Sequence, residues 1–436
     1  MKFRVRVAAI LGGFLLFASA SLEAQNAPIA FRTMIELAVR NSASSGISQA
    51  ELLRARAGFS QSKNLFLPQV TLGSGLAFSY GFPLSLEGSA PSIVRVDSQE
   101  FLFNPAQKEF IKAARSEVET TRAQSVDRRN EVMLETAIDY MQLDLLQSSL
   151  AAQREQQEFA AKYEDVVSQR VQAGLDSALD LTRAKLAAAK TRLALADTRA
   201  AIDQLRLRLA QLTGLPLDSV QTSTETIPEL PAVSQDADLS SQAMSRDSAV
   251  KVAEQAAIAK GFRAKGEEKQ LYPAVDLVAN YAVLARYNNY DVFFNHFQRN
   301  NATIGVAIRF PFLNPAQKAL ARSAEADYLK AQKDVQAAKD RAGADALRLQ
   351  RSVAQLSAAN EVTKLEHQLA EADVETIHEK IQTGGASLKD EQSARITEHE
   401  RYTNYLDSTF QLDRAQVQLL RQIGELEGWA LGPVRR

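Results

Sequence analysis

The chain has 436 residues and a nearly balanced charge, with 51 lysines and arginines against 52 aspartates and glutamates. This balance gives no electrostatic reason to expect nucleic acid as a partner. The sequence contains no cysteine, which excludes disulfides, thiolate metal sites, nucleophilic thiols and a lipid-modified cysteine.

Residues 1–24 are predicted to be a secretory signal peptide. Basic residues precede a short apolar run, Val7–Ala18, and small residues follow it, so cleavage after Ala20 or after Ala24 fits the pattern. The run is shorter than a membrane-spanning helix needs. No later segment has eighteen consecutive apolar residues, but this leaves open a membrane barrel, whose strands are short and alternating.

The sequence is duplicated. The pentapeptide Asn-Pro-Ala-Gln-Lys occurs at Asn104–Lys108 and again, 210 residues later, at Asn314–Lys318. Other landmarks recur at the same spacing: Gly174 and Gly384, Asp180 and Asp390, Gly214 and Gly424. A period this long indicates a duplicated domain and not a solenoid. The predicted division is residues 25–214 for the first repeat, 215–239 for a linker rich in Pro, Ser and Thr, 240–428 for the second repeat and 429–436 for a C-terminal tail.

Each repeat is expected to begin with a helix that leads to a proline. These helices are Thr33–Ser60, interrupted near Ser42–Gly46, and Ser241–Gln270. After the proline the apolar period changes from 3.6 to 2, which predicts strands. Four strands are expected, of which the second is the least clearly patterned: Val70–Tyr80, Ile93–Phe103, Val275–Tyr287 and Ala302–Phe310.

A long helix follows each pair of strands. Ala106–Gln172 has no Gly or Pro, and the second copy, beginning at Ala316, has only Gly343 before Thr383. About 65 helical residues would span about 100 Å. Glycines then interrupt the pattern, and return helices are expected over Ala178–Leu212 and Leu388–Leu426, the latter ending at Gly428. These are helical hairpins with glycine tips.

Four strands are too few to close a membrane barrel, because the smallest have about eight. An open edge in lipid would leave backbone groups unpaired. If the strands span a membrane, the chain must therefore oligomerise. The alternative is a small soluble β-subdomain that packs one face on the helices, and alternation alone does not separate the two.

In this order, the segments resemble the TolC-like outer-membrane efflux protein family over nearly all of the sequence after the signal. The segments that carry the resemblance are Leu65–Val70, Leu271–Val275, Phe101–Pro105, Phe310–Asn314, the tip Ala173–Asp180 and the closing pair Gly428-Trp429. The resemblance implies a mainly α fold with a membrane β-barrel contribution. A homotrimer would form a twelve-stranded barrel in the outer membrane on a periplasmic α-helical tube.

The resemblance also implies a function. The protein would be a passive outer-membrane exit duct of a tripartite efflux or type I secretion system, surrounded by outer-membrane lipid, with a large periplasmic part. A periplasmic adaptor and an inner-membrane transporter would be its partners, and neither the cargo nor the pump follows from the sequence. The alternative is a soluble periplasmic adaptor-type helical-hairpin protein. Two hairpins at one offset and four strands with lipid-like faces argue against it.

Three sets of site residues are predicted. The entrance tip and adaptor-docking residues are Gly174, Leu175, Ser177, Gly384, Gly385 and Ser387. Asp390 and Asp180 are candidates for an acidic constriction, with Lys389 expected to weaken the charge of Asp390. The lipid-facing strand residues are Val70, Leu72, Leu76, Phe78, Val306 and Ile308, with Ile304 on the same face. No catalytic residue, metal site or cofactor is predicted, because the four histidines form no metal-spaced pair and no phosphate-binding loop is present.

Overall fold

The computed structural model describes residues 28–76, 91–285, 296 and 298–432. The predicted signal peptide, the end of the first predicted strand and Phe78 lie outside these residues. In the part of the chain that is described, no helix is both long and apolar enough to cross a membrane.

The chain divides into two compact units. The hairpin unit comprises the chain up to residue 47, residues 127–247 and the chain from residue 340, and the sheet unit comprises residues 48–126 and 248–339. Each unit therefore takes pieces of both sequence repeats. The cause lies in the duplication itself, because strands from both repeats form one sheet and the two longest helices contribute residues to both units.

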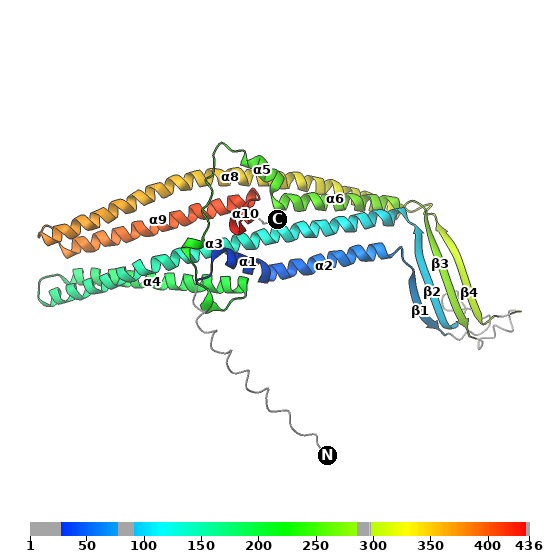
Figure 1. Cartoon of the computed structure of the whole chain (residues 1–436), viewed down its shortest axis with the longest axis horizontal. Helices are drawn as coiled ribbons and strands as arrows, with labels where there is room; N and C mark the ends of the chain where they lie inside the picture. Colours follow the sequence, from blue (N-terminus) through cyan, green and yellow to red (C-terminus); the bar gives the residue numbers. More distant parts are fainter. Residues whose placement is uncertain (1–27, 77–90, 286–295, 297, 433–436) are drawn as a thin grey trace, which may run out of the picture. The chain divides into compact units, whose positions relative to one another are not determined.

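Among the described residues, the sheet unit holds four strands, all of one helix and parts of three others, and Figure 1 labels these elements. Its elements are most of α2 (Ala43–Asn64), β1 (Gln69–Gly75), β2 (Ser92–Phe103), the first part of α3 (Pro105–Gln172), α6 (Ser248–Lys269), β3 (Ala274–Leu284), β4 (Asn300–Arg309) and the first part of α8 (Pro315–Gln382). The strands lie in the order β1-β2-β3-β4, and each neighbouring pair is antiparallel. The predicted strands are thus present, including the poorly patterned β2.

The repeated pentapeptide joins the sheet to the long helices. In both copies the asparagine side chain caps the new helix: Asn104 Oδ1 accepts the Gln107 N–H at 2.9 Å, and Asn314 Oδ1 accepts the Gln317 N–H at 3.0 Å. The proline takes the first helical position, where its missing N–H costs nothing. The pentapeptide is therefore a helix-start signal that the duplication has preserved twice.

The glutamine of the pentapeptide makes a second connection. Gln107 Nε2 donates to the Ser62 carbonyl at 2.7 Å, and Gln317 Nε2 donates to the Glu267 carbonyl at 2.9 Å. Both carbonyls lie in the last turn of the helix that precedes the strands, where backbone carbonyls have no N–H partner within the helix. Each buried glutamine therefore ties the end of one helix to the start of the next.

We expect Gln107→Ala and Gln317→Ala each to lower the free energy of unfolding by about 1–3 kcal/mol, because each leaves a carbonyl without its donor. Thermal unfolding followed by circular dichroism in detergent would measure the loss. Gln332→Ala, at an exposed position of α8, is the matched control and should behave as the unsubstituted protein. Equal melting temperatures for all three variants would contradict the assignment of the two glutamines as links between helices.

The hairpin unit contains the helical hairpins. Its elements are α1 (Phe31–Asn41), the rest of α3, α4 (Ala178–Thr213), the short 3-10 turns η2 (Leu217–Ser219) and η3 (Thr224–Thr226), α5 (Leu239–Arg246), the rest of α8, α9 (Leu388–Gln422) and α10 (Leu426–Leu431). The long helices α3 and α8 have 68 residues each, as the duplication predicts. The predicted linker 215–239 is folded against the helices, because its Val220 is fully buried.

The structure corrects two helix boundaries. Ser42 (φ −60°, ψ 145°) ends α1 at the interruption predicted near Ser42–Gly46. The predicted helix Ser241–Gln270 is two helices, since Asp247 (φ −55°, ψ 135°) leaves the helical conformation. The second return helix ends before Gly424, which has φ 74°, and not at Gly428 as predicted. Gly428 lies inside α10, a helix that also includes the start of the predicted tail.

An aromatic cluster forms the core of the hairpin unit. Phe31 contacts the rings of Tyr140 and Trp429 at centroid distances of 5.3 and 5.2 Å. The hydroxyl of Tyr140 donates to the Ile29 carbonyl at 2.7 Å and accepts the Ser223 N–H at 2.8 Å. The cluster thus holds segments from both ends of the described chain and from the linker.

A buried carboxylate lies in α3 of the same unit. Asp139 is 2% exposed, and burial raises its pKa from 3.8 to about 6. The guanidinium of Arg208 opposes this shift from 3.3 Å, but it also binds Glu135 at 2.7 Å. Asp139 therefore binds its proton more tightly in the folded protein than in the unfolded chain.

We expect this carboxyl group to cost stability as the pH rises. Its contribution is most favourable below about pH 4 and is lost as the pH approaches and passes about 6, by about 1–3 kcal/mol in total. Asp139→Asn should therefore melt at a higher temperature than the unsubstituted protein at pH 8, and the two should converge at pH 4. A constant difference between the two melting temperatures at every pH would contradict the assignment.

Candidate functional site: the strand faces and the hairpin tips

The strand register separates apolar from polar side chains. Leu277 pairs with Val306, Val275 with Ile308, and Ala279 with Ile304. Leu72 pairs with Val96 on the β1 side of the sheet. Because paired residues in a sheet point to the same face, the large apolar residues at even positions of β1, β2 and β4 and at odd positions of β3 share one face. Ser98 and Glu100 of β2 lie on the same face, opposite Ala279 and Leu277.

This apolar face is exposed in the chain. Exposed fractions are 79% for Ile304, 59% for Val306 and Ile308, 63% for Val70 and 77% for Leu72. Leu76, just past the end of β1, is 57% exposed. Among the described residues predicted to face lipid, those within the paired strands therefore lie on one exposed and mainly apolar surface, which soluble proteins rarely leave uncovered.

The opposite face carries a network of paired charges. Asp276, 1% exposed, accepts hydrogen bonds from Arg309 at 2.5 Å and Gln99 at 3.2 Å. Asp97 is bound by Arg95 at 2.8 Å and by the side-chain amide of Asn280. These residues occupy odd positions in β2 and β4 and even positions in β3, as the register requires. The sequence pattern predicted a small or polar face, but not that its charges would satisfy one another.

The sheet has two free edges. Among the described residues, β1 and β4 each pair with a strand on one side only. Unpaired edges are a template for pairing with another strand, and in lipid they cost several kcal/mol per unsatisfied group. Because β1 and β4 run antiparallel to each other in this order, β4 of one copy has the right direction to pair with β1 of the next.

The hairpin tips have the same geometry in both repeats. Gly174 (φ 75°) and Gly384 (φ 76°) adopt the left-handed conformation that ends a helix. In each copy the following N–H bonds back to the last turn: Leu175 N to the Arg170 carbonyl at 2.8 Å, and Gly385 N to the Lys380 carbonyl at 2.7 Å. The glycines therefore act as helix-ending residues, and Leu175 stands 67% exposed beside the first.

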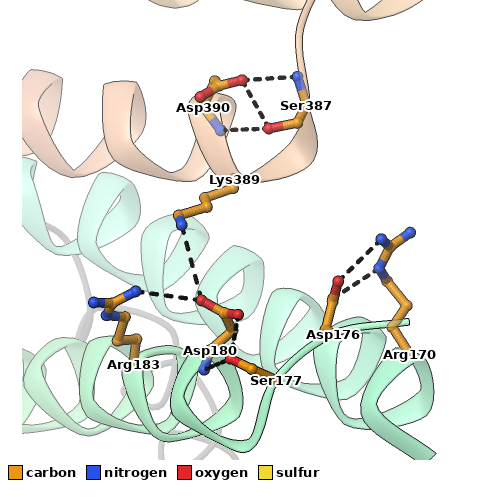
Figure 2. Close-up of polar contacts among 8 residues, drawn as sticks. All are labelled: Arg170, Asp176, Ser177, Asp180, Arg183, Ser387, Lys389 and Asp390. Atoms are coloured by element: carbon orange, nitrogen blue, oxygen red, sulfur yellow. Dashed lines mark hydrogen bonds and ion pairs between the residues drawn. The ribbon is translucent and has the colours of Figure 1, made fainter. Parts of the chain in front are cut away.

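Serine and aspartate begin each return helix. Ser177 Oγ accepts the Asp180 N–H at 3.2 Å, and Ser387 Oγ accepts the Asp390 N–H at 3.3 Å (Figure 2). Asp390 Oδ2 in turn accepts the Ser387 N–H at 2.9 Å, which completes a capping box. Hydrogen bonds from the serine hydroxyls are the main cause that holds the pKa of Asp180 and of Asp390 below the ordinary range. Both carboxylates are therefore ionised at neutral pH.

The charged neighbours of the two aspartates differ. The charge of Lys389 helps to lower the pKa of Asp390, after the larger effect of the hydrogen bonds from Ser387. The Lys389 ammonium also lies 3.8 Å from Asp180 Oδ1, across the two hairpins (Figure 2). Arg183 also lies 3.3 Å from Asp180. Asp180 thus has two cationic neighbours, whereas the ion pairs found among the described residues include none to Asp390.

Sequence reasoning missed one charged pair at the first tip. Arg170 binds both oxygens of Asp176, at 2.8 and 3.1 Å (Figure 2). The six-residue separation crosses the glycine turn, so no helical spacing rule points to it. The pair braces the turn between α3 and α4.

The described residues contain no group of three or more histidine, aspartate or glutamate side chains arranged to hold a metal ion. The candidate sites are therefore the apolar and polar faces of the sheet and the charged residues of the hairpin tips.

Comparisons with known proteins agree with this arrangement. Residues 93–215 match the model of the outer membrane efflux protein family. The fold is similar to CusC, whose structures concern folding and transmembrane channel formation, with a TM-score of 0.74 and 15% identity over 94% of this chain and 96% of that chain. It is also similar to the outer membrane protein VceC of Vibrio cholerae, with a TM-score of 0.69 and 22% identity over 90% and 96% of the two chains.

A third similar structure is the CmeC outer membrane channel of Campylobacter jejuni, with a TM-score of 0.76 and 13% identity over 91% and 86% of the two chains. No curated protein sequence matches the chain. The resemblance predicted from the sequence is confirmed: the chain has the fold of TolC-like outer-membrane channels, and part of it matches the efflux protein family.

Proposed function

We propose that the protein is a passive exit duct in the outer membrane, formed by several copies of the chain and used by an efflux system. The observation that carries the proposal is the four-stranded sheet, which has an exposed apolar face, a polar face whose charges are paired, and two free edges. Such a sheet suits a barrel wall with lipid outside and water inside.

Strand length and direction support a closed ring. β2, β3 and β4 have 12, 11 and 10 residues, close to the 9–11 residues that a tilted strand needs to cross a bilayer, and β1 has 7. Pairing of β4 with β1 of the next copy removes every free edge. With three copies, as in the homotrimer that the resemblance implies, the four strands of each chain give a twelve-stranded barrel.

The hairpins supply the periplasmic part of the proposal. In the trimer, α3, α4, α8 and α9 of each copy form the wall of a tube, and the tips around Gly174 and Gly384 form its entrance. A periplasmic adaptor and an inner-membrane transporter dock at these tips, and the transporter supplies the energy. Export of proteins by type I secretion is the second use of the same duct.

A soluble periplasmic adaptor is the competing function. An adaptor accounts for a helical hairpin and a secretion signal. It does not account for two hairpins with matching tips or for large aliphatic side chains exposed along the strands. The exposed face therefore favours the duct.

Membrane extraction and mass measurement test the proposal together. The protein should stay with the membrane after a sodium carbonate wash, should need detergent for extraction, and should then have the mass of three chains in mild detergent. A chain released by the wash, or a folded monomer that remains stable in detergent, would overturn the duct.

A further inference from the structure

Large apolar side chains surround the junctions between the strands and the helices. They come from the ends of strands or from the short segments beside them, and we call them the collar: Leu67, Phe103, Tyr272, Phe310, Phe312 and Leu313. Phe312 is fully exposed, Leu313 is 79% exposed and Phe310 is 70% exposed. The collar therefore continues the exposed apolar surface of the sheet beyond the last strand residue.

One lysine follows the collar in each repeat. Lys108 and Lys318 end the two copies of the pentapeptide and lie in the first turns of α3 and α8. Side chains on a helix lean toward its N-terminus, so both lysines lean toward the strand ends. Lys108 Nζ lies 5.2 Å from the ring centre of Phe103, which fixes this direction for the first copy.

Several lysines of the sheet unit are held by carboxylates, but Lys108 and Lys318 are not among them. Lys112 and Lys269 both bind Glu109, and Lys260 lies near Asp327. Within the described part of the chain, neither Lys108 nor Lys318 has a carboxylate within ion-pair distance. The exposed ammonium of Lys108 thus lies beside Phe103, and the exposed Lys318 follows Phe312 and Leu313 closely along the chain.

We propose that Lys108 and Lys318 bind the phosphate of glycerophospholipid headgroups, while the collar contacts the adjoining acyl chains. This inference rests on the proposed function, because it needs the sheet to lie in a bilayer. Aromatic side chains favour the boundary between lipid and water, and lysines near it extend their ammonium groups to the headgroups.

The test is lipid retention by the full-length mature protein. The protein is purified in mild detergent, exposed to phosphatidylglycerol, and weighed by native mass spectrometry to count retained lipid. One lysine near an anionic membrane surface strengthens binding of a protein to that surface by about fivefold. Lys108→Gln with Lys318→Gln should therefore reduce retention by about fivefold for each lysine that a lipid contacts, and arginine at both positions should restore it.

Matched controls separate this site from general charge. Lys162→Gln with Lys364→Gln removes one exposed lysine from each long helix, further along the chain, and should leave retention unchanged. Equal retention by the Lys108/Lys318 variant, or equal loss in the control, would overturn the proposal. Displacement of the lipid by inorganic phosphate at equal concentration would assign the lysines to free phosphate instead.

A carbonate wash of the same membranes distinguishes failure of the duct from failure of the lipid site. If the unsubstituted protein washes off the membrane, the duct fails and the lipid site fails with it. If the protein stays inserted and the glutamine variant retains as much lipid, only the lipid site fails.

Discussion

Val306→Arg is expected to destabilise the membrane-inserted assembly by about 2–4 kcal/mol if the residue lies near the middle of the bilayer. Val306 is 59% exposed on the apolar face and pairs with Leu277. A guanidinium there would have to leave water for lipid, and Glu100, a carboxylate on the same face, lies two strands away. The yield of oligomer that resists mild detergent should fall accordingly.

Ala307→Arg is the matched change one residue away. Ala307 pairs with Asp276, on the face where the charges are paired. One oxygen of Asp276 is buried without a hydrogen-bond partner, so an arginine introduced opposite it would meet a carboxylate. This variant should assemble and mainly alter conductance, while Val306→Leu should behave as the unsubstituted protein. Equal loss of assembly for the two arginine variants would contradict the assignment of the faces.

The sequence predicted the elements whose side chains repeat with a regular period. Alternation in β3 and β4 identified both faces, because in a strand every second residue must point the same way. The long helices were equally predictable, since α3 contains no glycine and the second copy of its pattern agrees. The positive φ angles at Gly174 and Gly384 follow from two helical runs separated by a few residues.

Features that depend on contacts between distant residues were not predictable. Gly424 and Gly428 are one helical turn apart, and only the structure shows that the first ends α9 while the second lies within α10. The pentapeptide was visible as a repeat, but the bond from Gln107 to the Ser62 carbonyl requires that α2 and α3 lie together. The ion pair between Lys389 and Asp180 was equally unpredictable, because the two residues belong to different repeats.

Asp390 is expected to control the ion selectivity of the assembled duct. In a trimer, Asp390 contributes three carboxylates at the tips, and a ring of carboxylates at a constriction favours cations. Its low pKa, which hydrogen bonds from Ser387 cause, keeps the ring charged at neutral pH. Because no ion-pair partner of Asp390 is found among the described residues, its charge is less compensated than that of Asp180.

The charge of Asp390 has to be separated from its role as a helix cap. Asp390→Asn removes the charge but leaves an oxygen that can accept the Ser387 N–H, so the start of α9 is kept. Ser387→Ala removes the cap hydroxyl and leaves the carboxylate, at a cost of about 1 kcal/mol to the helix. Only the first change should affect selectivity, whereas only the second should measurably lower thermal stability.

In planar-bilayer recordings, Asp390→Asn should therefore lower the preference for cations and weaken block by multivalent cations, with the yield of oligomer unchanged. Asp180→Asn should have a smaller effect, because Lys389 and Arg183 already offset the charge of Asp180. Lys389→Gln should act in the opposite direction and raise cation preference, since it frees that carboxylate. If Asp390→Asn leaves both selectivity and block unchanged while Ser387→Ala alters them, the tips are shaped by helix capping alone and Asp390 does not form the constriction.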